Sequence, residues 1–142
     1  MAAALCYGPG GGGCQLAFHL QAGSYNTDTL IGVLAQLRAF LGGQKATLLW
    51  DGLPAHRSTK MKRFLATQRD WLVAERLPAY APELNPVEGL WSNLKGKGGE
   101  LANLCYPNLA GVIAQAHRGI GRVRQRPHLA YSFLRRSGLE VW

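Results

Sequence analysis

Two carboxylates, Asp51 and Glu88, are the residues of this 142-residue sequence whose types and positions could do chemistry. Asp51 follows the apolar run at residues 45–50, and Glu88 opens an apolar-periodic segment. If the run and residues 71–75 are neighbouring strands, both acids come to the edge of a sheet where α/β proteins place ligands. Paired carboxylates with substrate phosphates usually hold Mg²⁺ or Mn²⁺. Two such ions would stabilise the attacking and leaving oxygens of a phosphoryl displacement.

Each of these acids also has a plain structural interpretation. Asn85 is a good helix N-cap and Pro86 suits the first helical position, so Glu88 could reach back to the cap backbone in a capping box. Asp51 could merely begin the turn at Gly52. A third acid, Asp28, is expected to be a surface residue that stabilises a helix dipole. From these patterns alone, a metal site and a purely structural role both stay open.

The elements that must position the acids follow from hydrophobic periodicity and capping residues. Strands are expected at residues 2–7, 14–20, 45–50 and 71–75, the first two as a hairpin around glycines 10–13, and the third buried. Helices are expected at residues 26–41, 58–68, 86–95, 107–120 and 127–136. Leu109 is assigned to the apolar face of the fourth helix, and Trp71, Trp91 and Phe133 are assigned to the core. This order predicts one α/β domain over residues 1–142.

The composition narrows the class of protein. The net charge of +8 indicates a polyanionic partner, most simply nucleic acid. No apolar run approaches the ~18 residues of a membrane span, and the N-terminus lacks the positive start of a signal peptide. Cys6, Cys14 and Cys105 have no CxxC spacing, which favours small buried side chains in a reducing cytosol over disulfides or zinc.

Basic residues flank both acids. The candidate DNA-binding residues are Arg57, Lys60, Lys62 and Arg63 after Asp51, and Lys95 and Lys97 after the Glu88 helix. Six more arginines occupy the acid-free residues 101–139: Arg118, Arg122, Arg124, Arg126, Arg135 and Arg136. Contacts from such residues to phosphates would give affinity without sequence reading, although a solvated basic face is the plain alternative for any one of them.

Two motifs carry a resemblance to a known family. Residues 48–58, LLWDGLPAHRS, resemble the second-aspartate motif of DDE-type transposases of the insertion-sequence 630 group, which is related to mariner elements. Residues 77–95, LPAYAPELNPVEGLWSNLK, resemble the glutamate motif of that family. The second motif is long and highly specific, and its distance from the first is also similar to the family's. The likeness extends from about residue 16 to the C-terminus.

The resemblance implies a ribonuclease-H-like mixed sheet with flanking helices and an Asp-Asp-Glu metal triad. It implies Mg²⁺- or Mn²⁺-dependent cleavage of transposon DNA ends and strand transfer to target DNA in the bacterial cytoplasm, with no membrane. Asp51 and Glu88 match the second aspartate and the glutamate, both catalytic and metal-binding. His56 and Asn85 match supporting positions of the family. The histidine could make a positioning contact, form a structural hydrogen bond or take part in catalysis.

The sequence departs from the family at the first aspartate. In the family this residue lies on a strand before the hairpin, but no acid precedes Asp28, and Gly52 replaces the usual asparagine. We therefore expect the C-terminal part of a catalytic domain that lacks its first strand and shows little strand transfer alone. The chain could be completed by a separately encoded upstream transposase half, be joined to one by frameshifting, or be a degenerate relic, and a homodimer is a further possible partner. The alternative function is a non-catalytic, basic, nucleic-acid-binding remnant.

Overall fold

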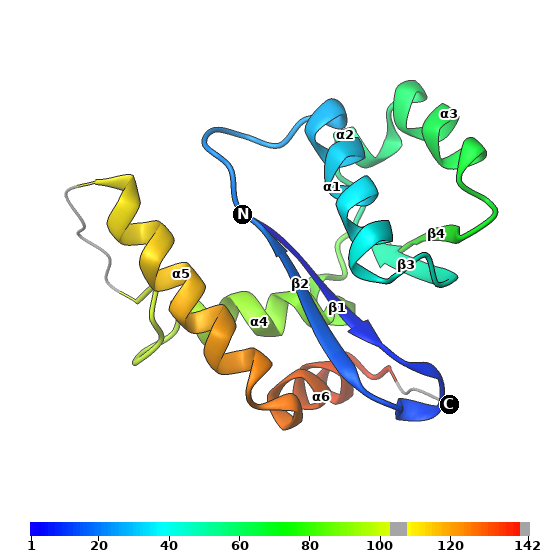
Figure 1. Ribbon diagram of the computed structural model, residues 1–142. Coiled ribbons are helices and arrows are strands. Elements are labelled where there is room, and N and C mark those ends of the chain that lie inside the picture. Colours follow the sequence, from blue (N-terminus) through cyan, green and yellow to red (C-terminus); the bar gives the residue numbers. More distant parts are fainter. Residues whose placement is uncertain (103–107, 140–142) are drawn as a thin grey trace. The chain divides into compact units, whose positions relative to one another are not determined.

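A computed structural model describes residues 1–102 and 108–139 of the chain. In chain order the elements are β1 (Ala2–Tyr7), η1 (Pro9–Gly11), β2 (Cys14–His19), α1 (Thr27–Phe40), β3 (Ala46–Trp50), α2 (Pro54–Arg57), α3 (Thr59–Thr67), β4 (Leu72–Arg76), η2 (Pro82–Leu84), α4 (Pro86–Lys95), α5 (Leu109–Arg124) and α6 (Pro127–Arg136) (Figure 1). The predicted α/β class is confirmed. Within the described residues, no helix is long and apolar enough to cross a membrane.

The chain divides into two compact units. One combines Met1–Leu20 with Glu83–Trp142, and the other is Gln21–Pro82. The first is called the hairpin unit below and the second the β3–β4 unit. Asp51 lies in the β3–β4 unit and Glu88 lies in the hairpin unit.

The predicted hairpin forms the sheet of the first unit. Strand β1 pairs antiparallel with β2, so that Ala2 lies opposite His19 and Tyr7 opposite Cys14. The turn needs glycine, since Gly10 and Gly11 have φ angles of 64° and 73°, which side chains disfavour. The glycine run therefore closes a hairpin, as its composition predicts.

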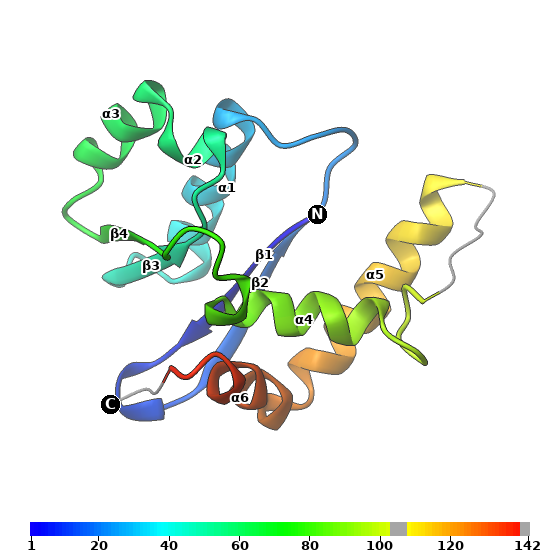
Figure 2. The same ribbon diagram turned by 180° about the vertical axis from the view of Figure 1, so that it is seen from behind.

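Three helices cover this hairpin. Helix α4 packs against β1 and α6, while α5 and α6 both contact β2 (Figure 2). The core of the unit consists of buried apolar side chains from all of these elements except β1: Leu16, Leu90, Leu94, Leu101, Ala116, Ile120, Val123 and Phe133. Burial of each large side chain contributes about 1.5–3 kcal/mol. The predicted core role of Phe133 is confirmed, and Trp91 packs partly buried against the same cluster.

The β3–β4 unit contains a parallel strand pair joined through helices. Ala46 lies opposite Leu72 and Trp50 opposite Arg76, so the carboxyl ends of both strands meet at one edge. Helix α3 contacts both α1 and β4 and carries the fully buried Met61. Trp71 is 3% exposed, which confirms its predicted place in the core. The two strands are therefore neighbours, which is the condition for their carboxyl ends to share an edge.

The predicted burial of the third strand is wrong. Leu49 of β3 is 44% exposed and Val73 of β4 is 52% exposed. Leu49 and Val73 lie on the same face of this two-stranded sheet as Thr47 and Glu75, and all four residues are exposed. Leu109 is also exposed, at 55%, because it begins α5 beyond the part of the helix that packs on the core.

Local capping matches the sequence closely. Asn26 caps α1 in a reciprocal box with Thr29, Ser58 caps α3 by accepting from Met61 N, and Asn85 caps α4. Cys6 and Cys14 are partly exposed, so the prediction of buried cysteines is wrong for these two: they belong to the two-stranded hairpin. Cys105, and the predicted start of the fourth helix at Pro107, lie outside the described residues.

Candidate active site

Asp51 stands at the carboxyl end of β3, as predicted. The strand pairing continues up to this point, since Leu77 N donates to Trp50 O at 2.8 Å. The Asp51 side chain is 48% exposed. Its Oδ1 accepts a hydrogen bond from Leu53 N at 3.1 Å, which turns the chain sharply after the strand.

His56 lies directly on this carboxylate. Its Nδ1 is 2.9 Å from Asp51 Oδ1 and 3.0 Å from the Asp51 carbonyl oxygen. The imidazole ring stacks on Trp50, with ring centroids 4.2 Å apart and an interplanar angle of 7°. The short helix α2, begun by Pro54, brings His56 back over the residue that ends the strand. The predicted supporting residue is therefore in contact with a predicted metal ligand.

One oxygen of Asp51 is left open by these contacts. Leu53 N donates to Oδ1, and His56 Nδ1 lies 2.9 Å from the same oxygen. Within residues 1–102 and 108–139, no hydrogen bond or ion pair reaches Oδ2. A half-exposed carboxylate with one uncommitted oxygen can accept a ligand without breaking the turn. The structural interpretation of Asp51 as a turn residue and its interpretation as a ligand are thus compatible.

Glu88 occupies the first turn of α4, as predicted. Asn85 Oδ1 accepts from Val87 N at 3.2 Å, and Glu88 N donates to Asn85 O at 3.0 Å. The carboxylate of Glu88 is exposed and, across the described part of the chain, has no hydrogen bond or ion pair. The capping-box interpretation is therefore wrong, because Asn85 alone caps the helix and Glu88 does not bond back. Glu88 is uncommitted, and Asn85 has a sufficient structural role.

Asp28, unlike the two motif acids, is committed to an ion pair. Asp28 lies in the first turn of α1 and pairs with Lys60, which confirms its surface position. Across the described ranges, no group of three His, Cys, Asp or Glu residues could hold a metal ion together. Asp51 and Glu88 each fit a hard cation on their own, since each presents an accessible carboxylate oxygen without an internal partner. Their approach to one another stays a prediction.

Most predicted DNA-binding cations point into solvent. Arg57, Lys62, Arg63, Lys95 and Lys97 are exposed. Apart from Lys60, none of the six predicted residues makes an ion pair with the described acids.

Two of the C-terminal arginines are engaged by partners within the protein. Arg122 Nε and Nη2 donate to the two oxygens of Glu100 at 2.5 and 2.8 Å, and Nη2 also bonds Asn93 Oδ1. Hydrogen bonding from Arg122 lowers the pKa of the Glu100 carboxyl. Arg124 donates twice to the carbonyl oxygen of Leu16. These guanidinium groups hold α5 to its neighbours.

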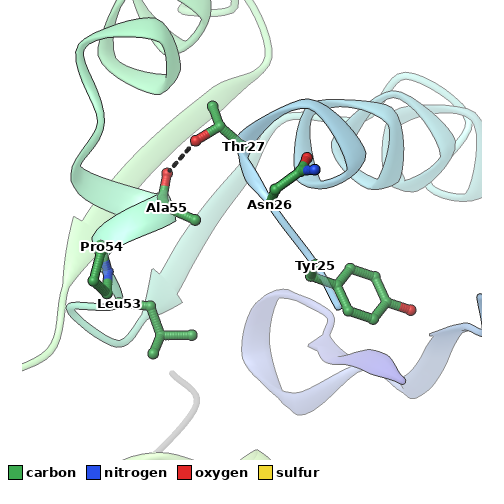
Figure 3. Close-up of a pocket in the computed structure, with 6 residues that line it drawn as sticks. All are labelled: Tyr25, Asn26, Thr27, Leu53, Pro54 and Ala55. Atoms are coloured by element: carbon green, nitrogen blue, oxygen red, sulfur yellow. Dashed lines mark hydrogen bonds between the residues drawn. The ribbon is translucent and has the colours of Figure 1, made fainter. Parts of the chain in front are cut away.

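A shallow pocket lies beside the Asp51 turn. It is lined by Tyr25, Asn26, Thr27, Leu53, Pro54 and Ala55 (Figure 3). The Thr27 hydroxyl donates to Ala55 O at 3.4 Å across one side of it. The pocket wall therefore includes Leu53, whose backbone fixes Asp51 Oδ1.

The segment between β4 and α4 has an unusual backbone. Tyr80 has a φ angle of 58° and a fully exposed side chain. A non-glycine residue in this region is uncommon and is often associated with function. The prolines at 78 and 82 indicate a stiff connection, but no residue pattern here predicts this conformation.

The contact of Trp50 with His56 was also not predicted. It depends on the helix α2, whose four residues are too few to show a helical periodicity. The one available signal is Pro54, a residue that commonly begins helices, placed two residues before His56.

The family model described as DDE superfamily endonuclease matches residues 12–103. This match covers more than half of the chain and includes Asp51, His56, Asn85 and Glu88. No curated protein and no solved structure matches the chain significantly. The chain belongs to the DDE superfamily endonuclease family.

Proposed function

We propose that this chain takes part in DNA transposition, as part of an endonuclease that cleaves transposon ends and transfers the freed strands to target DNA. We further propose membership of the insertion-sequence 630 group, related to mariner elements. In this proposal both units belong to one catalytic domain with a ribonuclease-H-like mixed sheet. Support comes from the family match and from both motifs, residues 48–58 and 77–95, which lie within it.

One observation carries the proposal: the two motif acids are accessible and keep uncommitted oxygens. Asp51 Oδ2 and the Glu88 carboxylate have no partner among the described residues. A carboxylate without an internal partner adds no ion pair to the fold and can accept a ligand at no cost to the packing. Such oxygens suit Mg²⁺ or Mn²⁺, which would be held by Asp51 and Glu88. When bound, the ion supplies stabilisation of the charge that develops on phosphate oxygens.

The protein's own residues would bind and orient the DNA. Arg57, Lys62 and Arg63 lie close in sequence after Asp51, while Lys95 and Lys97 follow the Glu88 helix. Their exposed charges can contact the phosphate backbone and so fix the register of the strand. Asn85 acts by holding the first turn of α4, on which Glu88 is carried.

The third carboxylate of the triad has no candidate at the matching place. Asp28 is the first acid in the sequence, and it is engaged by Lys60 at the start of α1. We propose that this ligand comes from outside these 142 residues, from a further transposase segment or a second copy of the chain. With two carboxylates alone, metal binding should be weak and strand transfer slight.

A second function rests on charge rather than on the acids. A net charge of +8 and many exposed cations would suffice for DNA binding without catalysis. The two functions differ in their dependence on Asp51 and Glu88.

The test is Mn²⁺ binding by calorimetry, together with nicking of supercoiled DNA in Mn²⁺. We expect Asp51→Asn and Glu88→Gln each to weaken Mn²⁺ binding by about tenfold or more and to abolish any nicking. Asp70→Asn is the matched control, because that exposed acid pairs with Arg38 and should leave Mn²⁺ binding unchanged. Nicking that survives both site substitutions would refute the proposed nuclease. DNA binding without any Mn²⁺ binding would favour the second function.

A further inference from the structure

We propose that His56 is a positioning residue, which holds the Asp51 carboxylate by Oδ1 so that Oδ2 alone faces the divalent ion. This inference rests on the proposed function, because it takes Asp51 as a metal ligand. It goes further by assigning different tasks to the two oxygens of one carboxylate, and by naming the groups that separate them.

The hydrogen-bond pattern fixes the protonation of the ring. His56 Nδ1 faces two oxygens, Asp51 Oδ1 at 2.9 Å and the Asp51 carbonyl at 3.0 Å. A carbonyl oxygen can only accept, so Nδ1 must carry the hydrogen and donate. In the neutral ring Nε2 is then the unprotonated nitrogen. His56 thereby donates to Asp51 in the Nδ1–H tautomer.

The ring itself is held against movement. Stacking on Trp50 at 4.2 Å covers one face, and only 12% of the His56 side chain is exposed. The Asp51 side chain is 48% exposed, so the partner that needs access to a ligand is the more open of the two. A rigid donor beside an accessible carboxylate lowers the entropy that ligand binding would otherwise cost.

Two N–H groups that follow Asp51 in the chain lie at the same oxygen. Leu53 N donates to Oδ1 at 3.1 Å, and His56 Nδ1, which donates to the Asp51 carbonyl, lies 2.9 Å from Oδ1. Rotation of the carboxylate would break the Leu53 hydrogen bond and take the negative Oδ1 away from the ring N–H. Oδ2 therefore keeps one orientation. Hydrogen-bonded partners of metal-ligating carboxylates typically contribute about 10–100-fold to metal affinity.

Three substitutions separate positioning from direct ligation. His56→Asn keeps a donor near the Nδ1 position but lacks Nε2, His56→Gln places its amide near the Nε2 position, and His56→Ala removes both. We expect about tenfold weaker Mn²⁺ binding for Gln and Ala, and affinity close to native for Asn. His128→Ala is the control, since His128 is exposed on α6. Mn²⁺ binding is measured by electron paramagnetic resonance of the free ion.

A second measurement needs no metal. Long-range ¹⁵N–¹H correlation spectra of the metal-free native chain should show His56 protonated at Nδ1. Thermal unfolding of each variant identifies any loss of folding, and the comparison of Asn with Gln then decides between roles if Ala does not fold.

The outcomes distinguish the inference from the function on which it rests. Native affinity in all three variants, an Nε2–H tautomer, or an Asn variant as weak as Ala would each overturn the positioning role, the last by indicating direct ligation through Nε2. A native chain that binds no Mn²⁺, or that is insensitive to Asp51→Asn, refutes the metal role of Asp51 and thus the proposed function itself.

Discussion

At the scale of single residues, the acids of this protein differ in whether they form ion pairs within the fold. Asp28, Asp70 and Glu100 are paired with Lys60, Arg38 and Arg122. Glu88 has no partner in the described part of the chain, and Asp51 has partners on one oxygen only. Glu75 and Glu83 likewise make no ion pair among the described residues, so it is the match to the two motifs, together with accessibility, that singles out Asp51 and Glu88.

The Glu100–Arg122 pair predicts a loss of stability in acid. Arg122 hydrogen bonds lower the folded-state pKa of Glu100 below its ordinary value. The pair therefore stabilises the protein fully above the unfolded pKa, and this contribution is lost as pH falls through the lower folded pKa. Glu100→Gln should cost about 1.5–3 kcal/mol at neutral pH, the range for hydrogen bonds to charged groups.

The measurement is urea unfolding at neutral pH and at successively lower pH. The difference between native chain and Glu100→Gln should shrink as the pH falls below about 4.3, the ordinary pKa of glutamate. Asp70→Asn provides the comparison, because that pair is 59% exposed on the acid side and should contribute little. A Glu100→Gln deficit that is constant with pH would contradict this assignment.

Residue-scale features that depend on neighbours in sequence could be predicted, and those that depend on packing could not. The caps at Asn26, Ser58 and Asn85 are local, because each side chain bonds a backbone N–H two or three residues ahead. The role of Arg122 depends on Glu100, 22 residues away. The Trp50–His56 stack depends on a short helix that has no periodic signal of its own.

At the scale of elements, the strands and helices lie where hydrophobic periodicity predicts them, but the periodicity did not predict how exposed each one is. Helix α6 has the predicted bounds, and the hairpin pairs as expected. The apolar run of β3 indicated a buried strand, yet Leu49 is exposed because burial requires neighbours that the run itself does not encode. Which sheet neighbours a strand acquires is a property of the whole arrangement.

Two glycines of α5 give a matched pair for testing the packing of this helix. A Cβ at Gly119 would collide with the side chain of Leu94, which is fully buried, and lie 2.9 Å from Glu100 Oε2. A Cβ at Gly121 would meet nothing within 4 Å. Gly119→Ala should therefore destabilise the protein by about 1–3 kcal/mol through overpacking.

The control substitution should act in the opposite direction. Gly121→Ala replaces a helical glycine in open space and should stabilise by about 0.5–1 kcal/mol. Thermal and urea unfolding of both variants measure the contrast. Equal effects of the two substitutions would mean that α5 does not approach Leu94 as closely as the structure indicates.

At the scale of the whole molecule, the positive charge is evident from the sequence, but the fold does not gather it in one unit. The net charge is +8, but Arg38, Lys60, Arg122 and Arg124 are engaged by internal partners. The cations left exposed occur in both units, so charge alone does not locate a DNA surface. Only the response of binding to salt, residue by residue, can do so.

The last prediction therefore compares two triple variants of equal charge. Arg57→Gln/Lys62→Gln/Arg63→Gln and Arg126→Gln/Arg135→Gln/Arg136→Gln each lower the net charge by three, from +8 to +5. If the first set contacts phosphates, the slope of log K against log salt for duplex DNA should become shallower by up to about 0.9 for each lost contact. The second set should change it little. Titrations by fluorescence anisotropy at several salt concentrations measure both slopes. Equal changes in the two slopes would show that DNA binding depends only on the net charge of the protein. The cations that follow Asp51 would then contribute no more than the others.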